Sequence, residues 1–259
     1  MKDWKRCRFL SICIIVSTKR FLSIINVLIY LIDTDCNFKM KGSTYMKAYQ
    51  VKISLIDSEP QIWRRIIIPA DITFKRLHDT IQFSMGWHDY HLYEFDFPQE
   101  KICITNDEES FEEFKFYSTK YKDKKLTKKE DPHGIIAKIV ETTVRKAQTL
   151  KIDGYIEKNV PFDYIYDLGD YWQHTIELEK IIDDYEFGYP AILEGEGACP
   201  PEDVGGMGGY DEFLLAWNDP KNPEHEAMRV WGESQNYREF DIALLNRLLK
   251  NLLKLKKIK

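Results

Sequence analysis

Two segments hold most of the side chains in this sequence that could do chemistry, and about thirty residues separate them. Residues 164–174 end in Asp-Leu-Gly-Asp-Tyr-Trp-Gln-His, and residues 195–210 contain Cys-Pro-Pro-Glu-Asp between glycines. Glycine and proline favour sharp backbone bends, so we expect the two segments to meet at one corner of the fold. The candidate residues of this functional corner are Asp167, Asp170, Trp172, His174, Cys199, Glu202 and Asp203.

Carboxylates beside a histidine could bind a divalent metal, and an open coordination position would then allow hydrolysis. The candidate ligands are Asp167, Asp170 and His174, and the wider set adds His91, Cys199, Glu202 and Asp203. The spacing of these residues matches no standard metal motif. A metal-dependent hydrolase is therefore one hypothesis for the function.

A structural role is the favoured interpretation of the same residues. On a strand, His174 shares the apolar face with Trp172 and Ile176, where a histidine ring is generally satisfied by a carbonyl or a carboxylate. Aspartates such as Asp167 and Asp170 cap the amides of turns. The sequence thus predicts no cofactor, with a divalent metal as the alternative.

The glycine-rich segment could bind an anion instead. It lacks the Gly-Lys-Ser/Thr of a phosphate-binding loop, but Gly208 and Gly209 precede a helical pattern, and the free amides there could hold a negative charge. We favour a rigid turn in which Glu202 and Asp203 cap those amides.

Trp63, Arg64 and Arg65 are the candidate nucleic-acid contacts, because tryptophan stacks on bases and arginine binds phosphate. Packing of the arginine stems along apolar surface is the commoner outcome. Residues 46–259 contain 29 basic and 39 acidic side chains, which disfavours a broad phosphate-binding surface. We therefore expect weak, non-specific nucleic-acid binding at most.

Residues 1–45 form an extension of different character, with 8 basic and 3 acidic side chains and two apolar runs interrupted by Lys19 and Arg20. Neither run is long enough to span a bilayer. Three interpretations stay open: translation that starts at Met46, a weak membrane-associating segment, or a helix packed on the domain. The five cysteines have no paired metal spacing, which favours a reducing, cytoplasmic location.

Hydrophobic periodicity predicts an α+β domain over residues 46–259 with a small mixed sheet. Two strands at 49–55 and 62–68, a helix at 74–85 ended by Gly86, and a strand at 93–97 give a β-β-α-β opening. A central hairpin at 162–178 follows.

The remaining segments predict a charged insertion and a helical C-terminal half. Residues 106–133 are polar and indicate a solvated insertion or a mobile loop, and 135–155 predict a short helix or strand. Helices are expected at 210–217 and 242–252, and the second carries a wide leucine stripe. This stripe covers a sheet face or forms a seam for a homodimer or a protein partner.

The order of the motifs resembles the plasmid pRiA4b ORF-3-like family, also called MM3350-like. The resemblance covers residues 48–255 and rests on 60–65, Leu77-His78, Gly86-Trp87, 91–95, 167–174, 195–203, Gly205-Gly206 and Gly209-Tyr210. It implies an α+β fold and an uncharacterised protein associated with plasmids and mobile elements. It supplies no catalytic residues. Together with the acidic body, it favours a binding or accessory module over an enzyme.

Overall fold

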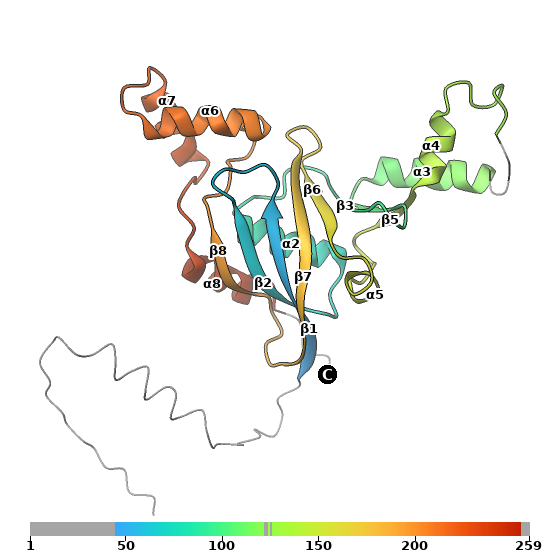
Figure 1. The fold of residues 1–259 in the computed structure, drawn as a ribbon, viewed down its shortest axis with the longest axis horizontal. Coiled ribbons are helices and arrows are strands. Elements are labelled where there is room, and N and C mark those ends of the chain that lie inside the picture. Colours follow the sequence, from blue (N-terminus) through green and yellow to red (C-terminus); the bar gives the residue numbers. More distant parts are fainter. Residues whose placement is uncertain (1–44, 122–123, 125, 255–259) are drawn as a thin grey trace, which may run out of the picture. The chain divides into compact units, whose positions relative to one another are not determined.

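The computed structural model describes residues 45–121, 124 and 126–254, and its centre is an open sheet of eight strands (Figure 1). The strand order is β5-β4-β3-β6-β7-β1-β2-β8, and all neighbours are antiparallel except the parallel pair β4–β5. The strands are β1 (Met46–Leu55), β2 (Trp63–Pro69), β3 (Tyr93–Phe97), β4 (Ile102–Thr105), β5 (Thr143–Lys146), β6 (Phe162–Tyr166), β7 (Trp172–Tyr185) and β8 (Ala191–Glu196). The α+β prediction is confirmed.

The predicted β-β-α-β opening is present, and its residues explain it. β1 and β2 form an antiparallel hairpin in which alternate residues of β1 are buried. Helix α2 (Phe74–Met85) begins where the Thr73 side chain accepts the Arg76 amide, and it ends at Gly86 with φ 107°. Glycine reaches this left-handed conformation without steric cost.

The C-terminal half contains more sheet than the sequence indicated. The hairpin of β6 and β7 is present, but β7 continues to Tyr185 and β8 then pairs with the outer edge of β2. The helices of this half are α5 (Asp153–Ile156), α6 (Gly206–Asn218), α7 (His225–Ser234) and α8 (Ile242–Leu252).

Part of the polar stretch 106–133, for which the sequence indicated a solvated insertion or a mobile loop, forms a helix. Helix α3 (Glu108–Lys120) begins at Asp107, whose side chain accepts the Glu109 amide, and it contains no buried residue. Acidic residues in the first turn and Lys120 in the last complement the helix dipole. Helix α4 (Ile135–Glu141) follows, and Figure 1 shows both helices beside β5.

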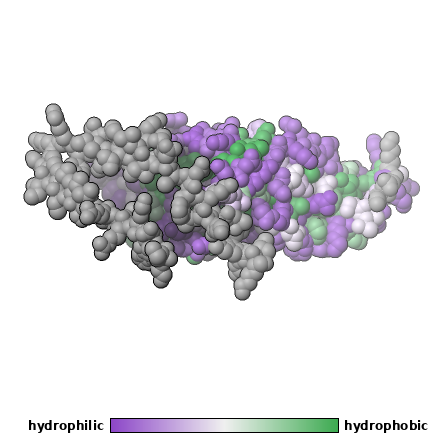
Figure 2. Space-filling model, turned by 90° about the horizontal axis from the view of Figure 1, so that it is seen from below, coloured by the Kyte–Doolittle hydropathy of each residue, from purple (hydrophilic) through white to green (hydrophobic). Residues whose placement is uncertain are grey.

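The two faces of the sheet differ in polarity. Helix α2 contacts β2 and α8, and α8 contacts β8, so these helices cover the core face. Leu249 of the leucine stripe is buried there, as is Leu253 directly after the helix, while Leu252 of the stripe is 53 % exposed. The described surface in Figure 2 is largely hydrophilic, with separate apolar patches.

Two sequence expectations concern membranes and the N-terminal extension. None of the helices within the described ranges is long and apolar enough to cross a bilayer. The three interpretations of residues 1–45 lie outside the described residues, apart from Tyr45.

Candidate functional site

The β6–β7 turn and the glycine-rich loop meet, as their composition predicted. The Gly205 amide donates to Oδ2 of Asp170 over 3.0 Å, and Gly206 packs against the backbone of Asp170. On the same turn, Oδ1 of Asp167 accepts the Gly169 amide over 2.9 Å. Both aspartates therefore have the turn-capping contacts of the structural interpretation.

Gly206→Ala is expected to destabilise the protein by about 1–3 kcal/mol, because its φ of 68° is strained for alanine and a Cβ would lie 2.8 Å from the Asp170 carbonyl oxygen. Gly208→Ala is the matched control, since no atom lies within 4 Å of its Cβ position. Urea unfolding should show Gly208→Ala equal to or more stable than the parent chain. Equal losses in the two variants would contradict the close contact.

A histidine and three carboxylates gather beside this junction. Nε2 of His91 lies 3.0 Å from Oδ1 of Asp203, 3.6 Å from Oδ2 of Asp167 and 3.8 Å from Oε2 of Glu202. The side chains of Asp167 and Glu202 are 11 % and 3 % exposed, whereas that of Asp203 is 70 % exposed. We call His91, Asp167, Glu202 and Asp203 the carboxylate corner.

Glu202 is held in place by groups from two other segments. Its Oε1 accepts the His88 amide over 2.7 Å and the Tyr166 hydroxyl over 3.0 Å. Burial, and then the neighbouring carboxylate, raise the pKa of Tyr166, so its hydroxyl remains a donor. The nearby Trp87 indole donates to the Pro200 carbonyl over 3.0 Å.

His174 lies in the core, away from the metal set predicted for it. Its Nδ1 contacts the carbonyl oxygens of Trp172 and Tyr164 at 2.9 and 3.3 Å, and its ring packs edge-on against Trp87. Burial lowers the pKa of His174 to about 4. Among the described residues it joins no cluster of potential metal ligands with Asp167 or Asp170, so the predicted hydrolase gains no support.

Arg64 cannot serve as the predicted nucleic-acid contact, because it is 1 % exposed. Its guanidinium donates to the carbonyl oxygens of Ser84, Trp63, Glu196 and Gly197 at 2.7–2.9 Å and stacks on Phe240. Burial lowers the pKa of Arg64 to about 10, which leaves it protonated at neutral pH.

Trp63 and Arg65 lie on the opposite, open face of the sheet. The Arg65 guanidinium pairs with Glu179 and Glu194, and it also lies 5.2 Å from the centre of the Trp63 ring. Arg65 therefore contacts tryptophan through its guanidinium and is paired with two carboxylates of the same face.

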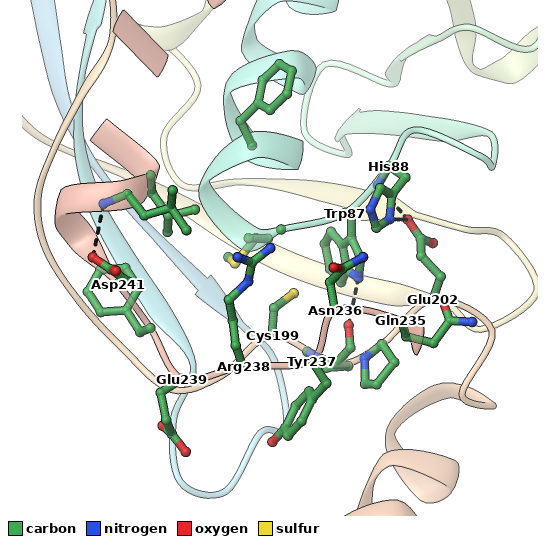
Figure 3. A pocket seen from close by; sticks show the side chains of 18 of the residues that line it. Trp87, His88, Cys199, Glu202, Gln235, Asn236, Tyr237, Arg238, Glu239 and Asp241 are labelled. Atoms are coloured by element: carbon green, nitrogen blue, oxygen red, sulfur yellow. Dashed lines mark hydrogen bonds and ion pairs between the residues drawn. The ribbon is translucent and has the colours of Figure 1, made fainter. Parts of the chain in front are cut away.

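A pocket adjoins the carboxylate corner and shares Glu202 with it, and His88 also lines this pocket (Figure 3). Its volume is about 190 Å³, and its wall comes from the end of α2, the loop 199–202, the segment 235–241 and α8. In Figure 3 the thiol of Cys199 and the indole of Trp87 face its interior. The apolar lining includes Phe83, Met85, Trp87, Tyr237, Phe240 and Leu245.

Cys199 is a neutral thiol in this pocket. Burial is the main cause that raises its pKa, and the nearby Arg64 guanidinium offsets only part of that effect. The thiolate is the reactive form of cysteine. Cys199 therefore lines the pocket as a neutral thiol and is not a nucleophile.

A family model described as plasmid pRiA4b ORF-3-like protein matches residues 47–248. The chain belongs to the plasmid pRiA4b ORF-3-like family. The uncharacterized protein y4hQ of Sinorhizobium fredii is similar to this chain, with 30% identity over 188 residues. The aligned region covers 73% of this chain and 82% of y4hQ. The crystal structure of MM3350 from Methanosarcina mazei, a protein of unknown function, matches with a TM-score of 0.56 and 32% identity, over 77% of this chain and 98% of that one.

The motifs that carry the resemblance to the pRiA4b ORF-3-like family converge on this region. Arg64, Gly86-Trp87 and 199–202 line the pocket, and His91 and Asp167 join the carboxylate corner. Sequence reasoning did not recognise His88 or the segment 235–241. The spacing His88-Asp-Tyr-His91 directly after a helix terminator was the available signal for the first.

Proposed function

We propose that this protein is a binding or accessory module that captures a protein partner by one large apolar or aromatic side chain. The observation that carries the proposal is the pocket of about 190 Å³ between α2, α8 and the loop 199–202. Hot-spot anchors of this kind fill desolvated pockets with a polar rim.

The size of the pocket decides between an anchor side chain and a larger ligand. Sites for drug-sized molecules have volumes of roughly 300–1,000 Å³, whereas a cavity of about 150 Å³ holds a benzene ring. The volume of about 190 Å³ therefore matches one aromatic or branched side chain. Trp87, Tyr237 and Phe240 in the wall can pack against such a group.

The charges around the pocket favour basic residues beside the anchor. Glu202, Glu239 and Asp241 contribute carboxylates to the lining, and the guanidinium of Arg64 is already bonded to backbone carbonyls. The exposed Arg238 adds one positive charge to the lining, but residues 46–259 as a whole have an excess of acidic side chains. Complementary charge raises association rates and suppresses wrong partners.

The association with mobile elements and a cytoplasmic location belong to the same proposal. The description of the family names a plasmid, and Cys103 and Cys199 are free thiols, which suits a reducing compartment.

Short peptides test the proposal directly. Fluorescence titration of Lys-Lys-X-Lys-Lys, with X as tryptophan, phenylalanine, leucine or alanine, should show saturable binding for the three large residues and none for alanine. Glu-Glu-Trp-Glu-Glu should bind at least about tenfold weaker than its lysine counterpart, because tenfold corresponds to about 1.4 kcal/mol and the coupling of close charge pairs across an interface is at least of that size.

A pocket-blocking variant provides the control. Leu245→Trp narrows the pocket and should abolish peptide binding, while Leu215→Trp on α6, at a side chain that is 69 % exposed, should leave it unchanged. Equal binding by the alanine peptide, or by the Leu245→Trp variant with a native circular dichroism spectrum, would contradict the proposal.

A further inference from the structure

We propose that His91, Asp167 and Asp203 bind a divalent transition metal ion of the zinc type. These three residues come from three segments: the loop between α2 and β3, the β6–β7 turn and the glycine-rich loop. The site is separate from the peptide pocket of the proposed function, and either can be absent without the other.

The distances between the three ligand atoms are those of a metal site. One ligand atom from each of the three residues lies within 4.8 Å of the other two. Metal–ligand bonds of about 2.0–2.2 Å give edges of roughly 3.3–3.6 Å in a tetrahedron, and Nε2 of His91 lies 3.0 and 3.6 Å from the two aspartate oxygens.

Two buried carboxylates at this corner have no lysine or arginine beside them among the described residues, and the imidazole of His91 is the ionisable group that faces them. The side chains of Asp167 and Glu202 are 11 % and 3 % exposed, and neither forms an ion pair with a lysine or an arginine of the described chain. Nε2 of His91 is itself a buried atom without a hydrogen-bond partner and faces these oxygens. Buried charges are generally paired or coordinate a metal. A cation bound by His91, Asp167 and Asp203 would bind the imidazole nitrogen and balance the charge of both buried carboxylates.

A second group of similar composition shows the contrast. His78, Asp79 and Asp89 also place one ligand atom each within 4.8 Å of one another. There the Lys75 ammonium lies 2.6 Å from Asp79 and 3.0 Å from Asp89, and both ring nitrogens of His78 have hydrogen-bond partners. Lysine supplies the positive charge of that group, and no corresponding residue contacts the carboxylate corner among the described ones.

The ligand types determine the class of ion. An imidazole nitrogen suits zinc, copper, iron and nickel, whereas magnesium and calcium favour sites made of oxygen atoms alone. One nitrogen with two carboxylate oxygens therefore favours Zn²⁺ over Mg²⁺. Glu202, 3.8 Å from the imidazole, adds negative charge beside the ion.

The test is calorimetric titration of the full chain, stripped with a chelator, with Zn²⁺ and with Mg²⁺ at pH 7. We expect one Zn²⁺ per chain, at least tenfold weaker binding of Mg²⁺, and at least a tenfold loss of Zn²⁺ affinity in Asp203→Asn and His91→Ala. Asp203→Asn changes an exposed side chain, so it should fold normally. Asp79→Asn, in the lysine-compensated group, is the matched control and should keep the parent affinity.

Two further readouts keep the result attributable to this corner. At one fixed Zn²⁺ concentration, the melting temperature of the parent and of Asp79→Asn should rise by more than that of Asp203→Asn. Co²⁺ bound in place of Zn²⁺ should give no thiolate charge-transfer absorption, which would indicate cysteine ligands. Parent-like Zn²⁺ affinity in the Asp203→Asn, His91→Ala double variant, thiolate absorption, or no Zn²⁺ binding would overturn the proposal, and none of these outcomes bears on peptide binding.

Discussion

Arg64→Met is expected to lower the free energy of unfolding by about 3–5 kcal/mol, because several hydrogen bonds from a charged donor are lost and buried carbonyls are left without a partner. Methionine keeps the approximate length of the side chain but donates no hydrogen bond. The carbonyls of Ser84, Glu196 and Gly197 would lose their partner, and the end of α2 would lose its link to the strand β8. Urea unfolding followed by circular dichroism measures the difference.

Arg65→Met provides the matched control at the next position. Arg65 is 26 % exposed and pairs with Glu179 and Glu194 at the surface of the sheet, where ion pairs contribute little. We expect a much smaller loss for Arg65→Met than for Arg64→Met. Similar losses in the two variants would show that charge at either position, rather than the carbonyl network, stabilises the fold.

The free energy of unfolding should fall by about 2 kcal/mol between pH 7.5 and pH 5 because of His174 alone. The pKa of His174 is about 4 in the folded protein against an ordinary value of 6.5, so the unfolded chain binds the proton more tightly. The contribution of the neutral His174 to the free energy of unfolding is therefore fully present above about pH 6.5, and it is lost as the pH falls toward 4. Urea unfolding at a series of pH values gives the slope.

His174→Asn removes the titrating ring and should flatten this pH dependence, although its stability at pH 7.5 is expected to be lower. Part of the slope should remain, because burial also lowers the pKa of His78. His133→Asn, at an exposed position, should retain the parent slope. A parent-like slope in His174→Asn would mean that the buried imidazole is not the group responsible.

Strands and helices with one buried face could be predicted from the sequence. Tyr93, Phe95 and Phe97 alternate with polar residues and are buried in β3. Strand β8 was not recognised, because Ile192 is its one buried residue and the others show no alternation. Helix α3 contains no buried residue, and its half-buried aromatic residues Phe111, Phe114 and Tyr117 lie among many charged side chains, which masked the helical pattern; the Asp107 cap and the acidic first turn were further signals.

The candidate site could be predicted only in part, because long-range pairing sets its geometry. Tyr93 of β3 pairs with Tyr166 of β6, and the Asp167 amide donates to the Leu92 carbonyl, which brings His91 beside Asp167. The sequence indicated that the two special segments meet, since their turn residues were evident. It could not show that His174 points into the core while His91 takes the place beside the carboxylates.

The strand order also determines when this sheet can be completed during synthesis. Arg64 binds carbonyls 132 and 133 residues further along the chain, and β8 pairs with β2 across a similar separation. At roughly 5–20 residues per second, a ribosome needs on the order of 10 s to cover that distance. Throughout this interval the outer edge of β2 is unpaired and the Arg64 guanidinium has only its local carbonyls. Such an edge invites pairing with other chains, so we expect nascent chains to need chaperone protection until β8 emerges.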